Sequence, residues 1–141
     1  MNKDQLIKSG NKVVRKPSVI RLNSEGHSQA GMSPWMTVPL VGEIVDGEPQ
    51  ERFYRVFEKM VNSPSKVRAG VWEATTYAEN LINYPYHEIV FLLEGSISII
   101  DDDSNEELFE PGDCFFLEQG FNGQWKQHDT IKIFHMTVAP T

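Results

Sequence analysis

The sequence predicts an all-β protein built as a sandwich or a barrel, and three observations support this class. Short runs of alternating apolar and polar residues recur from about residue 52 onwards, and clusters of turn-forming residues separate them. No run after residue 62 has the spacing of a helix. With 141 residues, 40% of them apolar, the chain is long enough to form one domain with a core of its own.

The expected strands follow one another along the second part of the chain. They cover Phe53–Met60, Lys66–Thr75, His87–Glu94, Ser96–Asp101, Glu106–Glu110, Asp113–Leu117, Gly123–Gln127 and Thr130–Val138. The first of these is ambiguous, because its apolar residues also fit helical spacing. The segment Asn62-Ser63-Pro64-Ser65 follows it like a hairpin turn, which favours a strand.

The first 50 residues contain frequent proline and glycine residues, which leave no room for a long regular element. Trp35, Met36, Val38 and Leu40 are apolar enough to lie along a core. We therefore expect residues 1–50 to form an extended N-terminal arm tied to a barrel of residues 51–141.

Charge and composition exclude several classes of partner. Residues 1–21 hold six basic residues and one acid, whereas the rest of the chain holds seven basic residues and nineteen acids, for a net charge of −7. An acidic body repels phosphate backbones, so we expect no nucleic-acid partner. The chain has a single cysteine, no run of about 18 apolar residues and no apolar signal core. We interpret it as a soluble cytoplasmic protein without a membrane partner.

Four sequence segments carry a resemblance to a known family: "GVWEATTY" (70–77), "YHEIVFLLEGSISI" (86–99), "PGDCFFLEQGFNGQW" (111–125) and the last strand. Residues 70–138 resemble the cupin superfamily, in particular the subgroup of (S)-ureidoglycine aminohydrolase and of ethanolamine-utilisation accessory cupin domains. The resemblance implies a double-stranded β-helix, that is, a jelly-roll cupin barrel. It says less about activity, because one barrel hosts many functions.

The cupin pattern places three histidines and a glutamate around a divalent metal. In this register the glutamate falls on Glu88, the first two histidine positions on Ile82 and Tyr84 (or one residue earlier), and the third on Gly123. Only the glutamate is retained, and one carboxylate does not hold a mid-row metal. We expect a degenerate metal site without metal ligands and no cofactor, with a divalent metal as the less favoured possibility.

Glu88 is the strongest candidate site residue. Strand alternation with the family register directs it into the barrel, where a buried carboxylate needs a partner. Trp72, Tyr84, Tyr86 and Trp125 are candidates for the walls of a pocket around it, although each could equally be a core residue. Gly123 leaves space that a nearby indole could fill. Such a pocket would suit a cationic or amine-bearing ligand.

The remaining histidines and the cysteine are given structural roles. His87 is expected on the opposite face of its strand from Glu88, His128 in a solvated turn, and His27 in the arm. His135 is expected to point outward, because its neighbours in the last strand form the more uniformly apolar face. Cys114 has no basic neighbour in the sequence and is expected to be a buried thiol.

The outer face of strand 87–94 is also apolar and needs a cover. Ile89, Phe91 and Leu93 share this face, and either the N-terminal arm or a second subunit must bury them. We expect a homodimer, with residues 30–45 lying across the partner.

Three functions remain open from the sequence. The first is a small-molecule-binding cupin with aromatics around Glu88. The second is a metal-dependent enzyme resembling ureidoglycine aminohydrolase and acting on a nitrogen-rich substrate. The third is a metal-independent isomerase or lyase that uses Glu88 as its catalytic base. Whether the chain is an enzyme is left undecided.

Overall fold

The computed structural model describes residues 6–9, 12–61 and 65–139, and within these the chain is all-β. Two sheets face each other. The six-stranded sheet has the order β11 (Cys114–Leu117), β8 (His87–Glu94), β13 (Ile131–Ala139), β6 (Ser65–Ala74), β5 (Gln50–Val61) and β3 (Met36–Thr37). The five-stranded sheet has the order β10 (Glu106–Phe109), β9 (Ile97–Asp101), β12 (Gly123–Gln127), β7 (Ala78–Leu81) and β4 (Gly42–Asp46). The strands β1 (Leu6–Ser9) and β2 (Lys12–Arg15) pair with each other in a separate two-stranded sheet.

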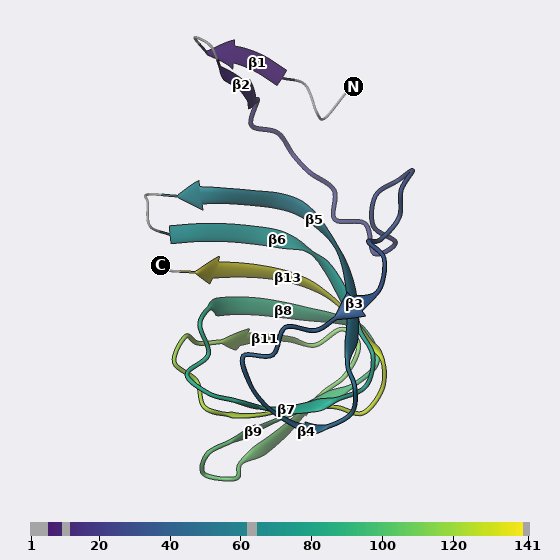
Figure 1. Cartoon of the computed structure of the whole chain (residues 1–141), viewed down its shortest axis with the longest axis vertical. Helices are drawn as coiled ribbons and strands as arrows, with labels where there is room; N and C mark the ends of the chain where they lie inside the picture. Colours follow the sequence, from purple (N-terminus) through teal and green to yellow (C-terminus); the bar gives the residue numbers. More distant parts are fainter. Residues whose placement is uncertain (1–5, 10–11, 62–64, 140–141) are drawn as a thin grey trace.

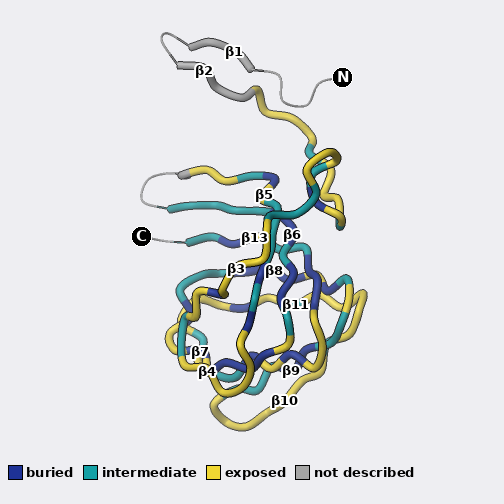
Figure 2. The backbone as a smooth tube through the Cα atoms, turned by 45° about the vertical axis from the view of Figure 1, so that its right-hand side comes forward, coloured by how far each residue is buried: buried dark blue, intermediate teal, exposed yellow. Residues whose placement is uncertain are grey.

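The arrangement of these strands confirms the predicted jelly-roll cupin fold. All neighbouring strands are antiparallel, and crossovers link the two layers. Figure 1 shows β5, β6, β13, β8 and β11 in this order, with β7, β9 and β4 in the layer beneath them. Buried residues gather where the layers face each other, and the turns are exposed (Figure 2).

The expected strands agree with the observed ones to within a few residues at each end. The ambiguous segment Phe53–Met60 is part of strand β5, which pairs with β6 as a hairpin partner. The turn expected at Asn62–Ser65 lies largely outside the described residues. None of the described residues forms a helix long and apolar enough to cross a membrane.

Strands β1–β4 and β7 were not expected. Met36 and Thr37 pair with β5, and Gly42–Asp46 pair with β7, so both sheets already include residues that precede position 51. These pairings lie within one chain, and the expectation that residues 30–45 lie across a partner stays a prediction. Of the four apolar residues placed along a core, Val38 is buried and Trp35, Met36 and Leu40 are exposed.

A segment of the N-terminal part covers one end of the outer face of the six-stranded sheet. Ser33 exchanges hydrogen bonds with Phe53 of β5, at 2.9 Å and 3.0 Å, and the His27 ring contacts the Tyr54 ring edge-on. The segment does not reach the face of β8, where Ile89 and Phe91 remain exposed.

Strand β11 contributes to the same uncovered face. Cys114 and Phe116 are exposed and pair with Phe91 and Ile89, whereas Phe115 packs against the core. The expectation that Cys114 is a buried thiol is therefore wrong. Alternation in β11 turns Phe115 inward, so both of its neighbours face solvent.

Candidate functional site: a closed-ended cavity in the barrel

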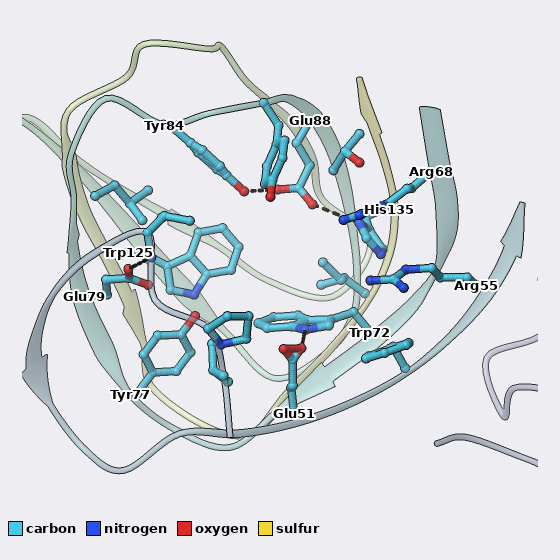
Figure 3. A pocket seen from close by; sticks show the side chains of 18 residues that line it. Glu51, Arg55, Arg68, Trp72, Tyr77, Glu79, Tyr84, Glu88, Trp125 and His135 are labelled. Atoms are coloured by element: carbon cyan, nitrogen blue, oxygen red, sulfur yellow. Dashed lines mark hydrogen bonds and ion pairs between the residues drawn. The ribbon is translucent and has the colours of Figure 1, made fainter. Parts of the chain in front are cut away.

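A cavity of about 180 Å³ lies between the two sheets. Its inner end is formed by Tyr77, Glu79 and Trp125, which are almost fully buried. The opposite end is lined by the more exposed Arg55 and Arg68, which mark its mouth. Figure 3 shows the two ends on opposite sides of the cavity. The volume lies below the roughly 300–1,000 Å³ of pockets for drug-sized ligands, so the cavity suits a small molecule.

The structure brings all five predicted site residues to this cavity: Trp72, Tyr84, Tyr86, Glu88 and Trp125. Three strands and a loop position them. Trp72 lies on β6, Glu88 on β8 and Trp125 on β12, while Tyr84 and Tyr86 precede β8. Gly95 ends β8 with a φ of +80°, a conformation that glycine adopts readily.

Glu88 is buried and both of its carboxylate oxygens have partners. The Tyr84 hydroxyl donates a hydrogen bond to Oε1 at 2.6 Å, and Nδ1 of His135 lies 3.0 Å from Oε2 (Figure 3). Burial raises the pKa of the Tyr84 hydroxyl, and the nearby Glu88 carboxylate raises it further. Tyr84 therefore keeps its proton and acts as a donor to Glu88.

His135 corrects one of our predictions. It lines the cavity and contacts Glu88, rather than pointing outward. Its neighbours Phe134 and Met136 belong to the outer face, where Met136 is exposed. We expected the more apolar face of β13, with Phe134 and Met136, to point into the barrel. In the structure that face points outward, and the face with His135 and Thr137 lines the cavity.

The other histidines are placed away from the cavity. His87 lies on the outer side of β8, as predicted, where its ring stacks on Phe116 and its Nδ1 accepts a hydrogen bond from the Gln119 backbone. His128 is exposed in its turn and contacts the Ser98 hydroxyl at 2.7 Å.

Two further glutamates line the cavity, and the sequence analysis did not single them out. Oε2 of Glu51 accepts a hydrogen bond from the Trp72 indole at 3.1 Å. Oε2 of Glu79 accepts hydrogen bonds from the backbone amides of Val41 and Gly42, at 2.7 Å and 2.8 Å. Burial raises the pKa of both carboxyls, and these hydrogen bonds offset part of the increase.

The aromatic walls are fixed by contacts among themselves. The Trp72 and Trp125 rings meet edge to face with centroids 6.2 Å apart, and the Tyr84 and Tyr86 rings do so at 5.6 Å. The Trp125 indole donates to Gln127, whose amide is in turn held by backbone carbonyls. The cavity therefore presents rigid ring surfaces next to carboxylates.

Gly123, at the position of the third cupin histidine, leaves no space for a side chain. A Cβ atom there would lie 2.4 Å from the Ile100 carbonyl oxygen and 2.6 Å from the Phe121 ring. The ring of Phe121 fills the space that we expected an indole to fill.

The residues of the cavity do not fit the metal that the cupin pattern implies. Glu88 and His135 supply one carboxylate and one imidazole, and Tyr84 stands at an expected histidine position. Among the described residues, the only group of three acids, histidines or cysteines with closely spaced ligand atoms is Asp101–Asp103, in the exposed turn between β9 and β10. There Asp101 accepts hydrogen bonds from its own turn, which lower its pKa.

Fold and site together define a cupin barrel whose cavity is closed at its inner end. The family model for the EutQ-like cupin domain matches residues 63–133, which is half of the chain. The chain belongs to this family. None of the curated proteins compared with the chain matches it.

Solved structures share the fold at low sequence identity. A Pseudomonas syringae pv. tomato protein of the DUF861 family, of unknown function, is 20% identical with a TM-score of 0.69, covering 91% of this chain and 48% of that one. EutQ of Clostridium difficile is 20% identical with a TM-score of 0.52, covering 64% and 69%. Ectoine synthase from P. lautus is 13% identical with a TM-score of 0.51, covering 74% and 70%. The chain thus spans about half the length of the first of these proteins.

Proposed function

We propose that this protein binds a small amine-bearing molecule in the barrel cavity, with Glu88 as the polar anchor and aromatic rings as the walls. The observation that carries the proposal is the arrangement of Glu51, Glu79 and Glu88 around one aromatic-lined cavity. Carboxylates and ring faces both attract positive charge. The proposed ligand class therefore follows from the lining of the cavity.

The carboxylates of Glu51 and Glu88 can each accept further hydrogen bonds from a ligand. A carboxylate accepts about four hydrogen bonds, and Glu88 uses two positions while Glu51 uses one. An ammonium group between them would find acceptors from two sides, because Figure 3 shows Glu51 and Glu88 on facing walls.

The subgroup resemblance supports the same ligand class. Ureidoglycine aminohydrolases and ethanolamine-utilisation proteins are both associated with nitrogen-bearing small molecules. The metal-dependent alternative has less support, because the cavity residues do not supply a cupin metal set. Glu88 as a free catalytic base also has less support, because both of its oxygens already have partners.

Isothermal titration calorimetry tests the proposal with a panel of alkylamines, ethanolamine, ureides and polyamines. We expect micromolar to millimolar binding of at least one amine, and at least a tenfold loss of affinity in Glu88→Gln. Glu94→Gln is the matched control, because Glu94 is exposed at the end of the same strand. Absence of heat with every compound, or equal affinity in Glu88→Gln, would overturn the proposal.

A further inference from the structure

Two arginines stand at the mouth of the cavity on neighbouring strands. Arg55 lies on β5 and Arg68 on β6, and both line the cavity beside His135 (Figure 3). Their side chains are 42% and 30% exposed, whereas Glu79 at the inner end is 2% exposed. The cavity is therefore acidic inside and basic at its entrance.

The Glu58 carboxylate contacts both guanidinium groups, in each case through the Nε atom. Oε2 of Glu58 lies 3.5 Å from Nε of Arg55 and 2.8 Å from Nε of Arg68. The second contact is an ion pair and not a hydrogen bond, since this buried N–H has no hydrogen-bond partner among the described residues. The Arg55 guanidinium also lies 4.6 Å from the centroid of the Phe53 ring, which supports it from one side.

The terminal amino groups of both arginines stay available. In both arginines it is the Nε atom that lies near Glu58. The terminal amino groups make no hydrogen bond to the residues that the structure describes. Lys66 also contacts Glu58, at 3.4 Å, so three cations share one carboxylate and the cluster keeps a positive charge on a chain whose net charge is −7. The pKa of Glu58 is lowered: its slight burial acts in the opposite direction, but the hydrogen bond from Lys66 and the two guanidinium groups outweigh it.

We propose that Arg55 and Arg68 form an anion subsite, and that the ligand is a small dipolar molecule with an amine at one end and a carboxylate at the other. This inference rests on the proposed function and names the ligand class more closely. The amine lies inside between Glu51 and Glu88, and the carboxylate lies at the mouth. Guanidinium groups match carboxylates because their planar forks donate two parallel hydrogen bonds.

The cavity size restricts the length of such a molecule. At about 180 Å³, below the roughly 300–1,000 Å³ of pockets for drug-sized ligands, the cavity admits only a short chain. Short ω-amino acids, from glycine to 5-aminovalerate, are suitable probes. Each has a matched alkylamine that lacks only the carboxylate.

Calorimetry with these pairs tests the inference. In the wild type we expect the best ω-amino acid to bind at least tenfold more tightly than its matched amine. Arg55→Gln/Arg68→Gln should lose this preference and bind both compounds with the affinity of the amine. Arg52→Gln is the matched control, because Arg52 lies on the same strand but pairs with Glu73 on the outer face.

A second variant, Glu58→Gln, should increase the affinity for the amino acid, a result that damage to the fold would not produce. Glu58→Gln keeps an oxygen acceptor for the guanidinium groups but removes the competing negative charge. We expect it to strengthen binding of the amino acid several-fold and to leave binding of the amine unchanged.

The possible results separate this inference from the proposed function. If the wild type binds amines and amino acids equally, or if the preference persists in the double variant, the anion subsite is wrong while amine binding stands. If no compound of either kind binds, both are wrong. A weakened preference in Glu58→Gln would also count against the subsite.

Discussion

Tyr84→Phe isolates the hydrogen bond that the Tyr84 hydroxyl donates to Glu88. The change removes one oxygen and keeps the ring, so the edge contact with Tyr86 is preserved and no large void is created. The bond is buried and 2.6 Å long, and hydrogen bonds to charged groups contribute about 1.5–3 kcal/mol. We expect the free energy of unfolding to fall by about 2 kcal/mol.

Urea denaturation measures this loss as a decrease of about 1 M in the unfolding midpoint, with an unchanged slope. Tyr54→Phe is the matched control, because the Tyr54 ring contacts His27 on the outer face and its hydroxyl makes no hydrogen bond to the residues that the structure describes. We expect this control to stay within about 0.5 kcal/mol of the wild type.

A double-mutant cycle with Glu88→Gln identifies the partner of the hydroxyl. The two changes should couple by about 1 kcal/mol or more, since the two groups are in direct contact. A loss below about 0.5 kcal/mol in Tyr84→Phe, or additive effects of the two changes, would refute the reasoning that Glu88 is held by this hydroxyl.

Three further outcomes follow from the structure. Burial raises the pKa of Glu51, so affinity for an amine should fall on acidification, at a higher pH than an exposed glutamate would give, as the carboxylate is protonated; Glu51→Gln should weaken this dependence in calorimetry, and an unchanged profile would contradict the assignment. Gly123→Ala should destabilise the fold by about 1–3 kcal/mol in urea, because its Cβ would meet the Ile100 carbonyl at 2.4 Å; an unshifted midpoint would show that the backbone moves freely there. The exposed Ile89 and Phe91 lead us to propose a homodimer, so light scattering should give twice 16.1 kDa and Ile89→Glu should give a monomer, whereas a wild-type monomer would exclude it.

Much of the fold could be predicted because the strands of the barrel alternate clearly and end at strong turns. His87–Glu94 and Gly123–Gln127 were predicted to the residue. Strands β4 and β7 could not be predicted in the same way. They are short, and in the sequence Ala-Glu-Asn-Leu of β7 the charged Glu79 is buried on the same face as Leu81, where its polarity leads one to expect solvent.

The site was predicted less completely, for a related physical reason. Alternation together with the family register directed Glu88 inward, where it lies, but the sequence analysis did not apply the rule to the strands that carry Glu51, Arg55 and Arg68. These residues read as surface charges in the sequence, and only the pairing of β5 with β6 places them on the wall of a cavity. His135 was misassigned because the polarity of the two faces of β13 is reversed there.

The residues that line the cavity come partly from inside and partly from outside the region that the family shares. The family region spans residues 63–133, yet Val38, Val41, Glu51 and Arg55 lie before it and His135 lies after it. The shared region thus supplies most of the frame, whereas flanking segments contribute to both ends of the cavity: the Val41 amide binds Glu79 at the inner end, and Arg55 lies at the mouth. If the proposed function holds, related chains would change ligand by altering only these flanks, and a shortened chain limited to the family region would lack part of the cavity lining.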